Sequence, residues 1–213
     1  MAIVFIGPPG VGKGTYARRI SEQLGIPSIS AGDLIRDQIR KRSAIGKKVA
    51  PIIARGDLIP DETVINLVVQ RVSKNDCKKG FILDGFPRTL NQAKKIEGKI
   101  KIAGVCWFTA PLRTLIKRIT GRRTCLSCHA TFNVHSFPPK KTGICDRCKD
   151  KIVQRSDETP KAVRERMEIY KKQSLPALHY YQKKRGKLVT KIDASDSVNR
   201  IVDASIKTIQ KIK

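Results

Sequence analysis

Short apolar runs alternate along this chain with longer stretches in which apolar residues recur at helical spacing. The runs are rich in β-branched residues and predict strands at residues 2–6, 81–83, 103–108 and 188–192, with a shorter one at 28–29. Helical spacing is found at residues 33–42, 61–74, 90–97, 111–120, 159–185 and 196–212. Strands that alternate with helices predict an α/β fold of three layers, in which helices cover both faces of a central parallel sheet.

The first apolar run leads into a glycine-rich loop, Gly7-Pro8-Pro9-Gly10-Val11-Gly12-Lys13-Gly14-Thr15, and a helical pattern follows it. Strand, glycine loop and helix are the context of a phosphate-binding P-loop, whose backbone N–H groups surround an anion at a helix N-terminus. Lys13 is expected to reach the outer phosphates and a hydroxyl to ligate Mg²⁺. Gly14 stands where Ser or Thr usually follows the lysine, and Thr15 comes one residue later. A glycine-rich turn without a ligand is the alternative, which the lysine and the flanking elements disfavour.

Residues 121–158 lack helical spacing and predict a small inserted domain. They contain Cys125-x-x-Cys128 and Cys145-x-x-Cys148, two knuckles separated by sixteen residues. Four thiolates at this spacing are typical of a closed structural Zn²⁺ site. Two disulfides are the alternative, which a reducing compartment disfavours. His129 adjoins the second cysteine, but four cysteines already complete a tetrahedron.

The chain of 213 residues has 44 Lys and Arg against 18 Asp and Glu, a net charge of +26. Such a charge attracts polyanions and predicts non-specific contact with nucleic acid. Aromatic residues make up only 5% of the chain, however, so platforms for base stacking are not evident. A nucleotide enzyme with several phosphate-binding arginines accounts better for the pattern. The sequence predicts no membrane span, and a first strand at residue 2 leaves no room for a leader, so we expect a cytoplasmic protein.

A second group of polar residues follows the apolar run at 81–83. Asp84 precedes Gly85-Phe86-Pro87-Arg88, and an acid at the carboxyl end of a strand beside a P-loop is suited to hold Mg²⁺ through water. The alternative is a plain Asp-Gly turn. Further arginines flank the cysteine segment, and together they suggest clamps on a polyphosphate, because the guanidinium binds phosphate oxygens bidentately. They are Arg118, Arg122, Arg123, Arg155, Arg164 and Arg166.

These motifs together resemble the adenylate kinase family, in its subtype with a zinc-bearing lid, over essentially the whole chain. The resemblance rests on the loop at 7–15, Ser30-Ala31-Gly32-Asp33-Leu34, Asp84-Gly85-Phe86-Pro87-Arg88, Gly121-Arg122-Arg123, the four cysteines and Arg155-Ser156-Asp157-Glu158. It implies a P-loop core at 1–29, 60–120 and 159–213, a small helical monophosphate-binding domain at 30–59, and a zinc-binding lid at 121–158. It also implies a monomer that transfers phosphoryl reversibly from ATP, with Mg²⁺, to AMP, giving two ADP.

The family roles carry over by position. The residues implied for ATP are Gly10, Val11, Gly12, Lys13, Gly14, Thr15, Arg118, Arg122, Thr131, Phe132 and Asp196. The residues implied for AMP are Ala31, Arg36, Asp57, Leu58, Ile59, Gly85, Phe86, Pro87, Arg88, Gln92, Arg155 and Arg166. The implied catalytic set is Lys13, Asp84, Arg88, Arg122, Arg155 and Arg166, with Asp84 and Asp157 orienting Mg²⁺ waters and lid arginines. The zinc ligands are Cys125, Cys128, Cys145 and Cys148.

Two positions depart from the family pattern. Ala31 stands where members that use AMP usually have Thr, and alanine there resembles the UMP/CMP kinases. Gln92 and the zinc lid favour AMP, since those relatives typically have Asn and a short lid. Glu158 replaces a second aspartate, which leaves its contacts open. Three functions therefore remain: an adenylate kinase, a pyrimidine monophosphate kinase on the same scaffold, and an RNA-associated P-loop zinc protein.

Overall fold

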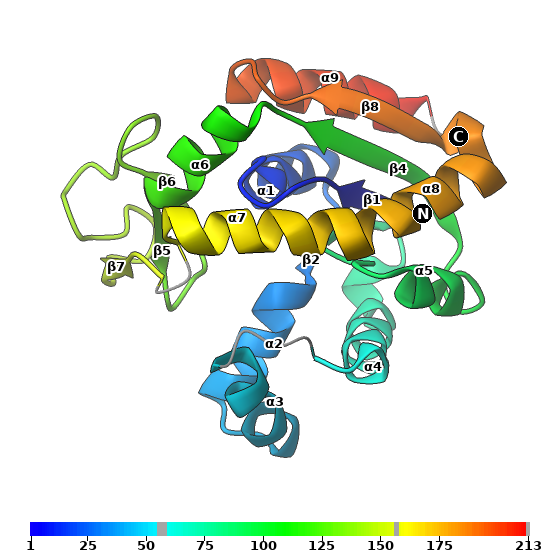
Figure 1. Ribbon diagram of the computed structural model, residues 1–213, viewed down its shortest axis with the longest axis horizontal. Helices are drawn as coiled ribbons and strands as arrows, with labels where there is room; N and C mark the ends of the chain where they lie inside the picture. Colours follow the sequence, from blue (N-terminus) through cyan, green and yellow to red (C-terminus); the bar gives the residue numbers. More distant parts are fainter. Residues whose placement is uncertain (55–58, 156–157, 212–213) are drawn as a thin grey trace.

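The computed structural model describes residues 1–54, 59–155 and 158–211, and a five-stranded parallel sheet forms its centre (Figure 1). The strand order is β2-β3-β1-β4-β8. The strands are β1 (Ala2–Ile6), β2 (Ser28–Ser30), β3 (Phe81–Asp84), β4 (Ile102–Thr109) and β8 (Val189–Asp193). All four pairings are parallel, so the predicted parallel sheet is confirmed.

Helices connect these strands and cover the sheet. Those of the core are α1 (Lys13–Leu24), α4 (Asp61–Val72), α5 (Leu90–Glu97), α6 (Leu112–Thr120), α7 (Pro160–Ile169), α8 (Leu175–Arg185) and α9 (Val198–Gln210). A 3-10 turn at Asn75–Cys77 precedes β3, and another at Gly186–Leu188 precedes β8. Within the described ranges, none of the helices combines the length and the apolar character that crossing a membrane requires.

The central strand β1 shows why the sheet is covered on both faces. Side chains alternate across a strand, so Ala2, Val4 and Ile6 face one way and Ile3 and Phe5 the other. The first three belong to an apolar cluster with residues of α4, α5 and α8, and the other two belong to a second cluster with residues of α1, α6 and α9. All five are buried. The predicted three-layer α/β fold follows from this double burial.

The predicted helix at 159–185 is interrupted. It consists of α7 and α8, joined by a π-helical turn at Tyr170–Ser174. Pro176 stands at the start of α8, where it has no N–H to donate to the preceding turn. A wider turn just before a proline accommodates the missing hydrogen bond and the bulk of the ring.

A helical hairpin projects from the core between β2 and α4, at the bottom of Figure 1. It consists of α2 (Ala31–Arg40) and α3 (Ala44–Ala54). The side chain of Ser30 caps α2 by accepting from the N–H of Asp33. The sequence pattern did not predict α3, which contains Gly46 and Pro51. A Cβ built on Gly46 would lie 2.0 Å from the carbonyl oxygen of Gln38, so glycine is needed for the approach of α3 to the end of α2.

The predicted insertion contains a small antiparallel sheet at one end of the molecule, on the left in Figure 1. Its strands are β5 (Arg122–Cys125), β6 (Thr131–Asn133) and β7 (Ile152–Val153), in the order β6-β5-β7. Its apolar cluster contains few buried residues: Cys125, Ala130, Phe132, Cys145 and Ile152. A cluster this small buries little apolar surface, so an additional crosslink is needed to order the segment.

We expect Gly46→Ala to destabilise the protein, because the added methyl group meets backbone atoms that cannot rotate away. Overpacking of this kind typically costs about 1–3 kcal/mol, which a fall in the melting temperature measures. Gly98→Ala is the matched control, since a Cβ there meets nothing within 4 Å. Equal melting temperatures for the two variants would contradict the close approach of α2 and α3.

Candidate active site and metal centre

The P-loop lies at the carboxyl end of β1. Gly10 and Gly12 have φ of +80° and +105°, which favours glycine at both positions. A Cβ on Gly12 would lie 2.6 Å from the Tyr16 ring, and one on Gly10 would lie 2.6 Å from the Ile119 side chain. The loop therefore packs against both α1 and α6. From α6, Arg118 donates to the carbonyl of Val11 at 3.1 Å. The N-terminus of α1 at this loop supplies the partial positive charge of an anion site.

Lys13 is folded against the loop. Its ammonium donates to the carbonyls of Gly7 at 2.7 Å and Pro8 at 3.0 Å. Water reaches part of the side chain, but the dense surroundings lower the pKa of Lys13 to about 8, chiefly by desolvation. Nearby guanidinium groups lower this pKa further, and Asp84 opposes them. A bound polyanion would reverse the balance by favouring the charged ammonium.

Asp84 ends β3, opposite Phe5 of β1 in the register. A Cβ built on Gly14 would lie 3.2 Å from Asp84 Oδ2, so the residue after the lysine stands directly beside this carboxylate. The close approach gives a physical reason for glycine at position 14. Burial raises the pKa of Asp84, whereas Lys13 and Arg88 act to lower it. An acid and a lysine thus meet at the carboxyl edge of the sheet, as the sequence predicts.

Arginines from separate segments gather around Lys13. Arg88, Arg122 and Arg166 are near enough to lower its pKa. Burial lowers the pKa of Arg155 to about 10, and the neighbouring charges of Arg36 and Arg122 lower it further. Among the described residues these cations outnumber the acids beside them, Asp33, Asp84 and Glu158. Repulsion of this kind marks a site that a polyanion stabilises.

Glu158 has a definite role that the sequence left open. Its carboxylate is fully buried and accepts from Arg122 Nε at 2.6 Å and from the backbone N–H of Arg155 at 3.1 Å. The buried Nη2 of Arg122 has no hydrogen-bond partner among the described residues. Glu158 therefore orients this guanidinium while leaving a donor for another acceptor. Asp157, the adjoining predicted acid, lies outside the described residues.

The predicted acceptor residues lie around the end of β3 and the start of α2. The backbone N–H of Arg88 donates to Gln92 Oε1 at 2.7 Å, and Gln92 Nε2 donates to Asp61 at 2.7 Å. An amide group has two donors and two lone pairs, so Gln92 retains one N–H and one lone pair beyond these two contacts. Arg88 Nε donates to the carbonyl of Gly85 at 2.9 Å. Burial lowers the pKa of the Arg88 guanidinium, although its side chain remains open to solvent.

The remaining residues predicted for the acceptor lie in the same part of the molecule, where the structure describes them. Ala31 is the first residue of α2 and is buried. Further along the same helix, Arg36 forms an ion pair with Asp33. The side chain of Phe86 is fully buried in the core, and Pro87 is buried beside it. Ile59 packs against the same apolar cluster. Asp57 and Leu58 lie outside the described residues.

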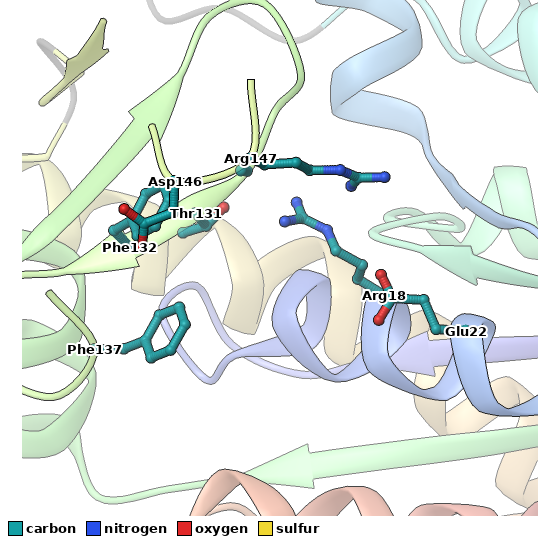
Figure 2. A pocket seen from close by; sticks show the side chains of 8 residues that line it. Arg18, Glu22, Thr131, Phe132, Phe137, Asp146 and Arg147 are labelled. Carbon is teal, nitrogen blue, oxygen red and sulfur yellow. The ribbon is translucent and has the colours of Figure 1, made fainter. Parts of the chain in front are cut away.

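A pocket of about 340 Å³ opens between α1 and the small sheet (Figure 2). Its lining includes the predicted Thr131 and Phe132, together with Arg18 and Glu22 of α1. Phe137 also lines it, and its ring stacks on that of Phe132 with centroids 6.0 Å apart. The sequence motifs did not identify Phe137 as a pocket residue. The available signal in the sequence was a second phenylalanine, besides Phe132, in the polar segment between the two cysteine pairs.

Arg19 of α1 links Phe137 of this pocket to the start of α9. The guanidinium of Arg19 lies 5.9 Å from the centroid of the Phe137 ring and donates to Asn199 Oδ1 at 2.6 Å. Asp196 precedes Asn199 in the same segment, and its exposed carboxylate accepts from the N–H of Ser197. Arg19 therefore contacts both Phe137, whose ring stacks on Phe132 of β6, and Asn199 at the start of α9.

The four predicted metal ligands lie together. Their sulfur atoms are all within 4.8 Å of one another, with 3.4 Å between Cys125 and Cys148 and 3.6 Å between Cys128 and Cys145. A tetrahedral zinc ion with Zn–S bonds of about 2.3 Å separates its sulfurs by about 3.8 Å. A disulfide needs about 2.05 Å. The separations therefore fit a metal ion and do not fit disulfides. The ring of His129 turns to Asp37 instead, at 3.0 Å.

A parallel sheet with a P-loop, an aspartate and converging arginines at its carboxyl edge defines the class of P-loop nucleotide-binding proteins. The model of the family described as Adenylate kinase matches residues 5–186. A protein named adenylate kinase from Thermosipho africanus is 44% identical over 217 residues, covering 100% of this chain and 99% of that protein. The adenylate kinase of Thermotoga maritima is 41% identical, and the match covers 97% of this chain and 96% of that protein. The adenylate kinase of Archaeoglobus fulgidus is also 41% identical, and the match covers 100% of both chains.

The chain therefore belongs to the adenylate kinase family, a family of kinase enzymes. The resemblance seen in the sequence motifs is confirmed, as is the enzyme class.

Lys13→Ala should lower turnover by a factor of at least about 10²–10³ while the protein stays folded, because a charge at the transferring group is lost. In the unmodified enzyme, kcat/KM for ATP should fall as the pH rises through about 8, where free Lys13 loses its proton. In contrast, kcat should remain high to a higher pH, because bound phosphates would favour the charged ammonium of Lys13. Lys78→Ala, an exposed lysine before β3, is the control. A folded Lys13→Ala variant of near-normal rate would refute the assignment.

Protein purified without chelator should contain one zinc ion per chain, measured by elemental analysis. Cys128→Ser should lose the metal, melt at lower temperature and become easy to cleave by protease between residues 121 and 158, because the segment has only a small core of its own. Part of the activity should persist at low temperature. Cys77→Ser is the matched control, since Cys77 is buried outside the cluster and should leave the zinc content unchanged. Protein without metal would overturn the zinc assignment.

Proposed function

We propose that this protein transfers the terminal phosphoryl group of ATP reversibly to AMP and forms two ADP. The observation that carries the proposal is the gathering of Arg88, Arg122 and Arg166 around Lys13 at the P-loop, with Arg155 near Arg122; a bound polyanion would neutralise this set of positive charges. Membership of the adenylate kinase family supports the same reaction.

Transfer between two phosphates needs positioning and charge neutralisation, and it needs neither a covalent intermediate nor a strong base. The P-loop from Gly10 to Thr15 would hold the ATP phosphates, with Arg118 at the loop. Arg122, Arg155 and Arg166 would neutralise charge that develops on the transferred group. Arg88 and Arg36 would bind the phosphate of the acceptor.

Mg²⁺ would neutralise phosphate charge when it is bound. The chain offers Asp84 and the hydroxyl of Thr15 for its coordination sphere, and the Asp84 carboxylate fits this role because it stands directly beside the P-loop residue Gly14. Zinc would have a structural role only, because the four cysteines complete its coordination.

The three-part division of the chain belongs to the same proposal: a core, an acceptor domain at 30–59, and a lid at 121–158. The lid carries Arg122 and Arg155, so its closure would complete the cationic site. Closure would also exclude water, which would otherwise compete with AMP as acceptor. A cytoplasmic monomer remains our prediction for the state of the protein.

The acceptor base is the finer question. Gln92 retains a donor and an acceptor for an adenine edge, which supports AMP. The missing hydroxyl at Ala31 removes one hydrogen bond, worth about 1 kcal/mol or about fivefold in affinity. A loss of that size weakens AMP binding without redirecting the site to a pyrimidine.

A coupled assay with ATP, Mg²⁺ and each of AMP, CMP, UMP and GMP tests the proposal. AMP should give the highest kcat/KM, and Ala31→Thr should lower the KM for AMP by up to about fivefold, because it restores one hydrogen-bonding hydroxyl. A higher kcat/KM for CMP or UMP would identify a pyrimidine kinase. No turnover with any acceptor, together with salt-sensitive RNA binding that survives Lys13→Ala, would favour the RNA-associated alternative.

A further inference from the structure

His129 at the tip of the first zinc knuckle contacts two other parts of the molecule. Its ring Nε2 lies 3.0 Å from Asp37 Oδ1 on α2, and this nitrogen donates because a carboxylate can only accept. Its backbone carbonyl accepts from Arg18 of α1 at 2.7 Å. A single residue of the lid therefore contacts both the acceptor-side helix and the core.

Ser127, two residues before His129, also lies close to α2. The carbonyl of Ser127, in the same knuckle, lies 3.5 Å from Arg40 Nη1 on α2. Arg40 also pairs with Asp37 at 3.0 Å, so the Asp37 carboxylate is oriented from its own helix toward the knuckle. The first zinc knuckle thus docks onto one face of α2.

The backbone of His129 is in a conformation that favours glycine. Its φ is +58°, and the residue after the last cysteine, Lys149, has φ +65°. The two positions are equivalent, because each N–H donates to the carbonyl of the first cysteine of its own knuckle, Cys125 at 3.1 Å and Cys145 at 2.9 Å. Glycine would fit both positions with less strain, so what a histidine adds at position 129 is its side chain.

Within the part of the chain that the structure describes, the His129 side chain makes a contact across the molecule and that of Lys149 does not. Lys149 Nζ donates to the carbonyl of Asp146 at 3.1 Å, within its own knuckle. His129 reaches Asp37 on α2 and lies 3.8 Å from Asp33. His129 and Lys149 therefore have the same local backbone structure, but only the His129 side chain bridges the lid and α2 among the described residues.

The helix that His129 contacts also carries acceptor-side charges. Arg36 precedes Asp37 and pairs with Asp33, and both Arg36 and Asp33 influence the pKa of Arg155 from the lid segment. The contact at Asp37 thus exists in the conformation that brings lid and acceptor-side arginines together. Stabilising the contact stabilises that conformation.

We propose that His129 is a positioning residue that links closure of the lid to the position of α2, so that binding of ATP and binding of AMP favour each other. The proposal rests on the proposed function, because it assigns ATP to the lid side and AMP to the α2 side. The hydrogen bond from the His129 ring to Asp37 forms when both parts are closed. Each ligand that closes one part therefore favours closure of the other.

Calorimetry tests the link at equilibrium and without turnover. The probes are AMP and Mg²⁺ with an ATP analogue whose β–γ bridging oxygen is replaced by nitrogen. In the unmodified protein the analogue should tighten AMP binding. In His129→Gly this coupling factor should fall about three- to tenfold, while the affinity for each ligand alone changes by less than twofold. Asp37→Ala should have the same effect, and the double variant should lose no more than either single one.

Lys149→Gly is the matched control, because it relieves the same backbone strain in the second knuckle without removing a bridge. It should leave the coupling factor unchanged. Because glycine suits φ +58°, His129→Gly should keep its zinc and its melting temperature, which separates positioning from structural damage.

Coupling that survives intact in a folded His129→Gly variant would overturn the link while leaving the proposed function standing. Equal loss in Lys149→Gly would also overturn it. Absence of AMP binding in the unmodified protein would instead overturn the proposed function itself, and with it the assignment of ligands to the two sides.

Discussion

The gathering of cations around Lys13, at the carboxyl edge of the sheet, is the constraint on which the rest of the site depends. Burial and neighbouring guanidinium groups lower the pKa of Lys13 and of Arg155, so both groups are held where their charge is partly disfavoured. The apolar clusters on the two faces of the sheet stabilise the framework that holds these charges together. A polyphosphate bound in this site would favour the charged form of both groups and so offset the desolvation and the repulsion.

The zinc centre and the charges are connected through the small sheet. Arg122 stands on β5 and is held by Glu158 at 2.6 Å, on a sheet with only a small apolar core. A flexible lid would hold these guanidinium groups imprecisely. Four cysteines that close around one ion would replace the missing core and keep the lid a rigid body that opens and closes as a unit. The metal would thus serve phosphoryl transfer through the position of arginines, at a distance from the chemistry.

Local patterns predicted much of this architecture, and tertiary contacts account for what they missed. The β1 strand, the P-loop and the cysteine set follow from short-range residue spacing, and the structure has them where expected. Helix α3 was missed because Gly46 and Pro51 disfavour helix locally, whereas its packing on α2 requires the glycine. The contacts of Glu158 could not be predicted, since Arg122 lies 36 positions away in the chain.

The two knuckle tips show what kind of information lies beyond local patterns. His129 and Lys149 follow the second cysteine of their respective knuckles, and both adopt a positive φ. Spacing alone would treat them alike. Only the approach of α2 distinguishes them, because Asp37 meets one and not the other. Backbone strain at the first tip is offset by a contact between the knuckle and α2. In the proposed mechanism, bound nucleotides would offset the charge repulsion in the site, so both unfavourable terms would be compensated in the same conformation.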